Sequence, residues 1–372
     1  MISSIRIEGY RGFDCFEMSG LGRINLLVGT NNSGKTSVLE AIYLLFSAGD
    51  PSALRQVIRQ RGEYLPPRFL NTGYRPTNST ADLGVSHLFA GHELHPGSSI
   101  RIRAENQSSP REIEYAIEEL SPRDQAEILG ANDESSLFPQ LFIAVSGNPK
   151  PALAKIPLTN AGGLDPLRLR AGKALQRTSD WGRATFMGTD SFSGDELVSM
   201  WNEIALGPTE GLVLKALQFL DPEIERIAAQ ATSGPYYSNQ ARGGFIIKRR
   251  GWENPVPIGS MGDGMWRMLG MSIAIAQCRG GVMLVDEIDT GLHYSVMSQM
   301  WRLIHNAAKE LDVQVFATTH SYDCVYSLAQ ICSGADIQKS VTVQRIEPGK
   351  KRSVPYDEDE ITVAASRDIE VR

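Results

Sequence analysis

The stretch from Gly29 to Thr36 limits most strongly what this chain can fold into. It reads Gly-Thr-Asn-Asn-Ser-Gly-Lys-Thr and fits the phosphate-loop pattern G-x-x-x-x-G-K-[ST]. The apolar run 24–28 before it predicts a buried strand, and the apolar positions within 39–46 after it predict a buried helix. A strand, a glycine-rich loop and a helix in this order direct backbone N–H groups and the positive helix end at one point. We therefore expect a polyphosphate site here.

The residues of this loop divide between phosphate binding and metal binding. Lys35 is placed to reach the β- and γ-phosphates, and the Thr36 hydroxyl is placed to bind Mg²⁺. The other loop positions expected to bind the nucleotide are Gly29, Asn31, Asn32, Ser33 and Gly34. An ordinary glycine turn is the alternative, and the matching flanks on both sides make it the weaker one.

Two further strands predict the rest of a nucleotide site. The apolar run 282–285 ends in Asp286, which can hold Mg²⁺, and Glu287, which can orient and deprotonate the attacking water. The run 313–318 leads through a hydroxyl pair to His320, which can donate a hydrogen bond to the γ-phosphate. A helix predicted over 295–311 makes one right-handed crossover, so both strand ends should meet at one sheet edge. A solvated strand end and a structural histidine are the alternatives.

A second candidate anion site lies ahead of Asp286 and Glu287 in the chain. Ser260 and Gly262 stand in the segment 258–267, just ahead of a long apolar helix. A helix N-terminus attracts anions. Because one triphosphate does not need two such sites in one molecule, we expect this one to close on the nucleotide of a partner subunit. A plain glycine-rich helix cap is the alternative.

The remaining pattern predicts a β-rich middle and a helical stretch. Alternating residues predict strands near 5–10, 100–103, 113–117, 141–145 and 156–158, with a hairpin turn at 106–110. Helical spacing begins at Gly194 and stops at Asp221-Pro222, and further strands are expected at 245–248 and 341–343, with a short helix from Asp357. We expect 50–78 to be a loop-rich connector. Its basic edge (Arg55, Arg59, Arg61, Arg68) is either a contact for nucleic acid or a partner, or a solvated face.

Composition narrows the class of protein. Of 372 residues, 42% are hydrophobic and 22% charged, and the net charge of −6 does not favour indiscriminate binding to nucleic acid or membranes. The four scattered cysteines form no C-x-x-C pair, which argues against a zinc site or a disulfide framework. The N-terminus lacks a signal-peptide pattern, and Arg267 interrupts the most apolar region, 265–285, so no membrane span is predicted. We expect a cytoplasmic protein.

The set of motifs resembles the ABC-type ATPase heads. More narrowly, Arg11-Gly12-Phe13, the segment 260–264 and the segment 286–293 resemble AAA-type ATP-binding proteins related to the OLD (overcoming lysogenization defect), RecF and SMC ATPases. The resemblance covers roughly 1–50 and 195–372. It implies an α/β ABC-ATPase-like head with a P-loop parallel core sheet, a side antiparallel β lobe and a helical lobe. We expect one domain over 1–372: an N-terminal lobe to about 160, a helical insertion over about 161–260, and a lobe with Asp286 and His320 over about 261–372.

The resemblance also implies an assembly and cofactors. Two copies would form a head-to-head homodimer, alone or within a higher oligomer, with two ATP molecules and Mg²⁺ held between the Lys35 loop of one copy and Ser260 and Gly262 of the other. Arg11 matches an N-terminal arginine that reaches the nucleotide in SMC-like heads. The segment 260–264, called the cap segment from here on, reads Ser-Met-Gly-Asp-Gly instead of the transporter-type Leu-Ser-Gly-Gly-Gln. The segment Gly291-Leu292-His293 matches the OLD-like group. Gln140 is the candidate for the Q-loop glutamine.

Three functions stay open at this stage. The leading hypothesis is an ATP-hydrolysing switch that controls a separate effector, a nuclease or a toxin, in anti-phage defence. The stretch after His320 is too short for the TOPRIM nuclease domain of OLD proteins, so we expect the ATPase part alone. A RecF- or SMC-like DNA-repair ATPase acting on DNA is the first alternative, and a non-hydrolysing scaffold that binds ATP is the second.

Overall fold

The computed structural model describes residues 1–65, 81–106, 110–119, 141–148, 155–159, 161–165, 182–230, 242–332 and 340–367. Gln140 and Arg68 lie outside these ranges. Within them, no helix is long and apolar enough to cross a membrane. Cys15, Cys278, Cys324 and Cys332 are free thiols.

The centre of the molecule is a six-stranded sheet in the order β10-β14-β15-β3-β16-β17. Its strands are β3 (Ile24–Val28), β10 (Ala184–Met187), β14 (Val282–Val285), β15 (Gln314–Thr318), β16 (Val341–Arg345) and β17 (Val354–Tyr356). All neighbours are parallel except β16 and β17. Every residue of β3, β14 and β15 is buried, as expected for parallel strands covered on both faces. The strands that lead into the three predicted nucleotide motifs, β14, β15 and β3, are consecutive in the strand order of this sheet.

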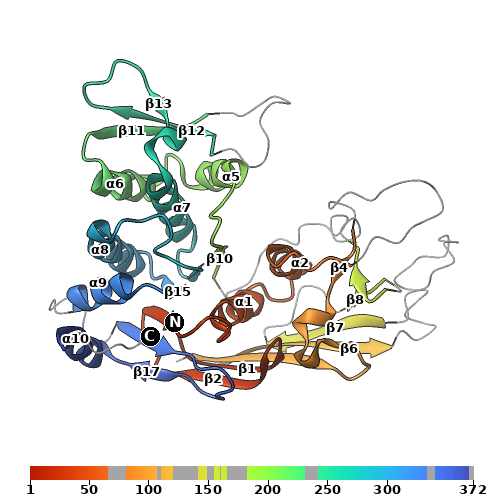
Figure 1. Cartoon of the computed structure of the whole chain (residues 1–372). Helices are drawn as coiled ribbons and strands as arrows, with labels where there is room; N and C mark the ends of the chain where they lie inside the picture. Colours follow the sequence, from red (N-terminus) through yellow and green to blue (C-terminus); the bar gives the residue numbers. More distant parts are fainter. Residues whose placement is uncertain are drawn as a thin grey trace, which may run out of the picture.

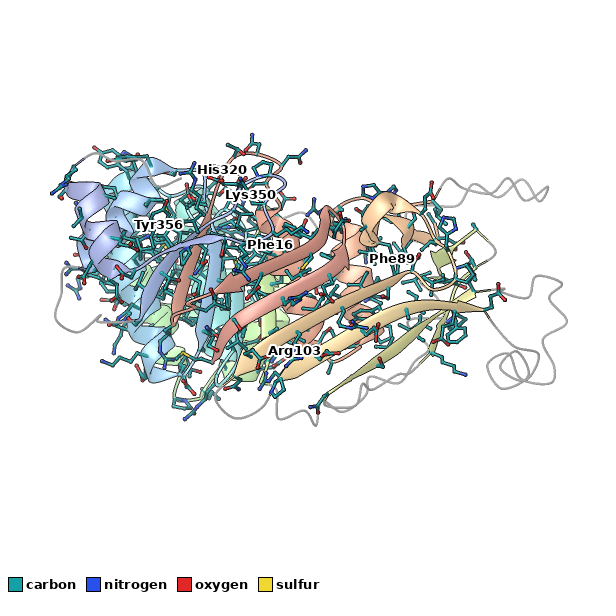
Figure 2. The ribbon with its side chains drawn as sticks, turned by 90° about the horizontal axis from the view of Figure 1, so that it is seen from below. Phe16, Phe89, Arg103, His320, Lys350 and Tyr356 are labelled. Atoms are coloured by element: carbon teal, nitrogen blue, oxygen red, sulfur yellow. The ribbon has the colours of Figure 1, made fainter. Side chains whose placement is uncertain are left out.

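A second, antiparallel sheet in the order β2-β1-β5-β6-β7-β8 forms the side lobe (Figure 1). Its strands are β1 (Ile2–Tyr10), β2 (Phe13–Ser19), β5 (Ser99–Asn106), β6 (Arg111–Glu119), β7 (Leu141–Asn148) and β8 (Lys155–Pro157). The buried residues of alternating strands share one apolar core with α1 (Lys35–Phe46). The opposite face, which carries Arg103 in Figure 2, is covered with exposed ion pairs. The buried Gln314 amide joins the two sheets by bonding both the N–H and the carbonyl of Ile2.

A helical lobe completes the molecule. It contains α5 (Gly194–Ile204), α6 (Glu210–Leu220) and a three-stranded sheet of β11 (Ile224–Ala229), β12 (Phe245–Arg249) and β13 (Val256–Pro257). Figure 1 shows this lobe on the opposite side of the core from the antiparallel sheet. The almost wholly buried helix α7 (Asp263–Gln277) runs from the lobe to the core. Helix α8 (Tyr294–Glu310) packs on α7, α9 (Tyr322–Cys332) packs on α8, and α10 (Glu358–Ser366) packs on α9. Short elements are β4 (Leu83–Gly84), β9 (Gly163–Leu164), η1 (Ser86–Leu88), η2 (Ala90–His92) and η3 (Ile258–Met261).

These elements confirm the predicted mixed α/β fold, the hairpin of β5 and β6, and the helices that stop before Asp221 and start after Asp357. The expectation of a loop-rich connector from residue 50 was wrong at its start. Residues Pro51–Gln60 form helix α2, because the Asp50 side chain accepts a hydrogen bond from the Ser52 N–H at 2.8 Å and proline occupies the first turn. The helix buries an apolar face that includes Leu54 and Val57. Both signals were present in the sequence.

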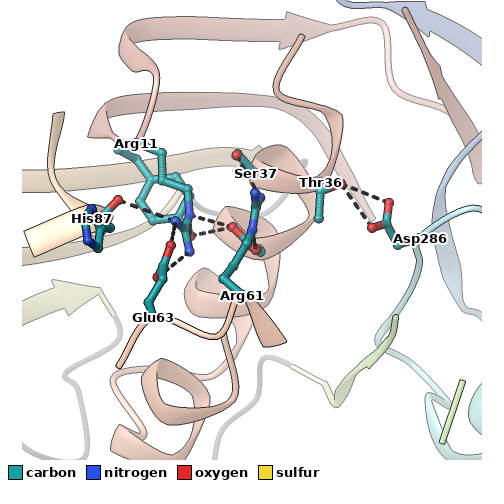
Figure 3. A network of polar contacts seen from close by, with 9 residues as sticks. Arg11, Thr36, Ser37, Arg61, Glu63, His87 and Asp286 are labelled. Carbon is teal, nitrogen blue, oxygen red and sulfur yellow. Dashed lines mark hydrogen bonds and ion pairs between the residues drawn. The ribbon is translucent and has the colours of Figure 1, made fainter. Parts of the chain in front are cut away.

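A buried carboxylate holds the first helix in place. Glu40 of α1 is 1% exposed and forms an ion pair with Arg11 at 2.8 Å. Its oxygens accept hydrogen bonds from Arg61 at 2.7 Å and from the Tyr10 hydroxyl at 3.0 Å. Arg11 also bonds Glu63 at 2.6 Å. Figure 3 shows how this network joins the turn between β1 and β2, helix α1 and the end of α2.

We expect the Glu40→Ala substitution to destabilise the fold strongly. It leaves two arginines without their buried carboxylate, and removal of one partner of a buried ion pair costs about 3 kcal/mol or more. Urea denaturation measures the loss. The control is Glu8→Ala, which removes a partly exposed partner of the exposed Arg6 and should cost less than about 1 kcal/mol. Equal, small losses in both variants would contradict a structural role for Glu40.

Candidate functional site

The phosphate loop, residues 29–36, follows the carboxyl end of β3. In the core sheet β3 lies between β15 and β16. The backbone requires glycine at both ends of the loop. Gly29 has φ of 144° and Gly34 has φ of 98°. A Cβ atom would lie 2.2 Å from the Ile346 carbonyl oxygen at the first position and 2.3 Å from the Phe13 ring at the second. The two pattern glycines thus allow the loop to pack closely against the residue that follows β16 and against the first residue of β2.

The side chains of the phosphate loop and the helix end next to it favour the binding of an anion. The Lys35 ammonium donates to the carbonyl oxygens of Gly29 at 2.8 Å and Thr30 at 2.9 Å. Burial lowers the pKa of Lys35, and the charges of Asp286 and Glu287 oppose that shift. Among the residues that the structure describes, the buried Ser33 hydroxyl has no hydrogen-bond partner and no side chain caps the N-terminus of α1. A buried cation, an unpartnered hydroxyl and an uncapped helix end fit a polyphosphate group.

A hydroxyl–carboxylate pair lies beside the loop (Figure 3). The Thr36 hydroxyl donates to the Asp286 carboxylate, with 3.1 Å to each oxygen. Asp286 also accepts from the Thr318 hydroxyl at 2.6 Å. Oxygen atoms of this kind are the ligands that Mg²⁺ prefers, usually one or two from protein with the remainder from phosphate and water. The structure therefore brings together the two residues predicted to bind the metal.

Glu287 follows Asp286 in an uncommon backbone conformation. Its φ of 46° lies in the left-handed region, which costs about 1 kcal/mol or more for a residue other than glycine. Its N–H donates to the Thr318 hydroxyl at 2.8 Å, and its carboxylate accepts from Thr290 at 3.2 Å. The conformation is thus held by contacts with the neighbouring strand and with the following loop.

Arg267 of α7 contacts the same segment. In the sequence this residue stands out only as a charge that interrupts an apolar run. It is 3% exposed, and its guanidinium donates to the carbonyl oxygens of Gly188 at 2.7 Å and Thr189 at 3.1 Å. It also donates to the carbonyl oxygens of Asp286 at 2.7 Å and Glu287 at 2.9 Å. Burial lowers the pKa of Arg267 to about 10, so it stays charged at neutral pH. An arginine inside a buried helix was the signal that could have marked it.

The cap segment lies at the surface. Ser260 in η3 and Gly262 are exposed, and α7 begins at Asp263 with no side-chain cap from any part of the chain that the structure describes. Asp263 forms an ion pair with Arg242. A Cβ atom at Gly264 would lie 3.0 Å from the Gly291 carbonyl oxygen, so the cap packs against the loop that follows Glu287. The cap is thus open to solvent beside the loop of the second motif.

His320 and Arg11 lie in different surroundings. His320 is exposed and follows Thr319, whose N–H donates to the Leu27 carbonyl at 3.3 Å, so it leaves the sheet at the edge where the phosphate loop begins. The Arg11 guanidinium is 8% exposed and engaged by Glu40 and Glu63. The structure shows Arg11 in a buried ion-pair network, and its contact with a nucleotide stays a prediction.

Comparisons with known families agree with this site. A family described as "AAA ATPase domain" matches residues 1–135, and a family described as "AAA domain, putative AbiEii toxin, Type IV TA system" matches residues 164–323. Fold, site and these matches define the class of protein: the chain is an ATPase, and two separate parts of it each match an AAA-type domain family. The predicted ATPase activity is confirmed at this level, which leaves the non-hydrolysing scaffold without support. The narrower resemblance to the OLD group stays a prediction.

Individual relatives are more distant. An "ATP/GTP phosphatase" from Helicobacter pylori is 22% identical over 354 residues, which is 90% of either chain. A DNA replication and repair protein RecF from Bacillus cereus is 37% identical over 65 residues, 17% of either chain. An SMC head solved with the C-winged helix domain of ScpA has a TM-score of 0.48 at 14% identity, covering 96% of this chain and 97% of that one. The SMC head domain from Thermotoga maritima has a TM-score of 0.44 at 12% identity, covering 96% and 99%.

Proposed function

We propose that this ATPase is a dimeric switch, in which ATP closes two copies head to head and hydrolysis opens them. One observation carries the proposal. Lys35, Thr36 and Asp286 are gathered at one sheet edge, whereas Ser260 and Gly262 lie exposed at the start of another helix. Each chain thus has one loop to hold a triphosphate and one free helix end to cover a triphosphate held by a second copy.

The proposed roles follow from the contacts. Lys35 exchanges its two loop carbonyls for phosphate oxygens, and the Ser33 hydroxyl gains a partner. Thr36 and Asp286 would hold Mg²⁺, which when bound neutralises charge that develops on the transferred phosphoryl group. Glu287 accepts the proton of the attacking water and His320 contacts the γ-phosphate. The other proposed phosphate contacts are Gly29, Asn31, Asn32 and Gly34, with Ser260 and Gly262 supplied by the partner copy.

We further propose that the switch acts on a separate effector, in a cytoplasmic anti-phage role. The match to a family whose description names a toxin and a toxin–antitoxin system supports a link to a toxic or defensive output. We propose likewise that the chain divides into an N-terminal lobe, a helical insertion and a C-terminal lobe, with boundaries near residues 160 and 260.

The short RecF match supports a second candidate function, a DNA-dependent ATPase. Stimulation of turnover by added DNA would favour that candidate.

A mixing experiment tests the shared site. The Lys35→Ala and Ser260→Arg variants should each lose nearly all ATP turnover, because each spoils both sites of its own homodimer. A mixture contains hybrid dimers in which one site combines the intact loop of the Ser260→Arg copy with the intact cap of the Lys35→Ala copy. Because half of the dimers are then hybrids with one good site of two, an equimolar mixture should recover about a quarter of wild-type turnover.

The controls define what would contradict the proposal. Mixing Lys35→Ala with Thr36→Ala places both defects in the same loop, so no hybrid site is complete and no turnover should return. If the Lys35→Ala and Ser260→Arg mixture stays as inactive as this control, although both variants fold, the cap does not act across a dimer.

A further inference from the structure

The buried hydroxyl of Thr318 connects the two acids of the site. Thr318 ends β15, is 1% exposed and lies next to Asp286 across the sheet. Its hydroxyl is 2.6 Å from Asp286 Oδ1 and 2.8 Å from the N–H of Glu287. No motif assigned a role to this residue.

The directions of these two bonds follow from their partners. The Glu287 N–H can only donate, so the Thr318 oxygen accepts from it. An ionised carboxylate can only accept, so the single hydroxyl proton of Thr318 points at Asp286 Oδ1. The Thr318 hydroxyl therefore bonds Oδ1, whereas Oδ2 has the Thr36 hydroxyl as its neighbour, which lies 3.1 Å from both oxygens.

We propose that Thr318 is a positioning residue that selects the oxygen of Asp286 that faces the metal and fixes the backbone from which Glu287 projects. The inference rests on the proposed metal-binding role of Asp286. Partners that orient metal ligands in this way are worth about 10- to 100-fold in metal affinity. Because Glu287 stands at φ of 46°, the same hydroxyl also stabilises the strained step between the two acids.

The neighbouring residue offers a matched comparison. Thr319 is equally buried, and its hydroxyl donates to Asp289 Oδ1 at 2.6 Å. It thus makes the same kind of bond, from the same strand end, to an acid that is not proposed to bind metal. A loss of hydroxyl at Thr319 should disturb the loop without weakening metal binding.

The test compares the Thr318→Val, Thr318→Ser and Thr319→Val variants of the full chain. The readout is the affinity for Mn²⁺ in the presence of ATP, measured by electron paramagnetic resonance, together with ATP binding in excess chelator and thermal unfolding of the free protein. We expect Thr318→Val to bind Mn²⁺ about 10- to 100-fold more weakly. ATP binding without metal should be unchanged, and Thr318→Ser and Thr319→Val should stay close to the wild type.

Three outcomes decide the matter. Wild-type Mn²⁺ affinity in Thr318→Val would overturn the inference while leaving the proposed function intact. Equal weakening in Thr319→Val would overturn it as well, because the effect would then be a general one of losing a buried hydroxyl. ATP-dependent Mn²⁺ binding absent from the wild type would instead reject the metal site itself. If Thr318→Val does not fold, Thr318→Ala against Thr318→Ser replaces it, since both lack the methyl group and differ only in the hydroxyl.

Discussion

In the Glu287→Gln variant, we expect ATP turnover to fall by about 100-fold or more while ATP still binds. The amide has the shape of the carboxylate and can still accept a hydrogen bond from Thr290, so the loop should keep its form. It cannot accept the proton of the attacking water. The ATP-bound dimer should therefore persist, and light scattering after gel filtration with ATP and Mg²⁺ should show twice the monomer mass.

The control for this prediction is Glu310→Gln, at the exposed end of α8, where the same chemical change lies away from the site. It should turn over ATP as the wild type does. Phosphate release by Glu287→Gln at the wild-type rate would exclude Glu287 as the base. Loss of turnover without a stable dimer would keep the base and argue against the proposed closing step.

The second large effect is expected at Arg267, where the Arg267→Met substitution should cost about 3 kcal/mol or more of unfolding free energy. The substitution keeps an apolar stem of similar length but leaves four partly buried carbonyl oxygens without their donor. Each hydrogen bond from a charged group is worth about 1.5–3 kcal/mol, and the contributions are not additive. Because two of these carbonyls belong to Asp286 and Glu287, turnover should fall even where the variant is folded.

Urea denaturation and phosphate release measure the two effects at Arg267. Arg302→Met on the exposed side of α8 is the control and should change stability by no more than about 0.5 kcal/mol. Arg267→Lys keeps the charge but not the planar fork, so it should lie between Arg267→Met and the wild type. A midpoint for Arg267→Met equal to that of the control would show that the guanidinium is not needed to hold this segment.

The site residues that belong to short continuous motifs could be predicted from the sequence. The loop from Gly29 to Thr36 and the pair of acids after β14 are short strings with matching flanks, and both lie at the same sheet edge as predicted. Helix α2 has a local start signal in Asp50 and Pro51, but the arginine, proline and glycine residues that follow it favour a loop-rich connector.

The sequence alone determined the class of site, because a phosphate loop needs only backbone N–H groups, a lysine and a hydroxyl from one continuous segment. Tertiary structure alone decided how that site is supported. Thr318, Arg267 and Glu40 each act on residues distant in the chain, through the strand order of the core sheet and the packing of α7 and α1. Such contacts depend on which elements become neighbours in space, and residue periodicity does not encode that choice.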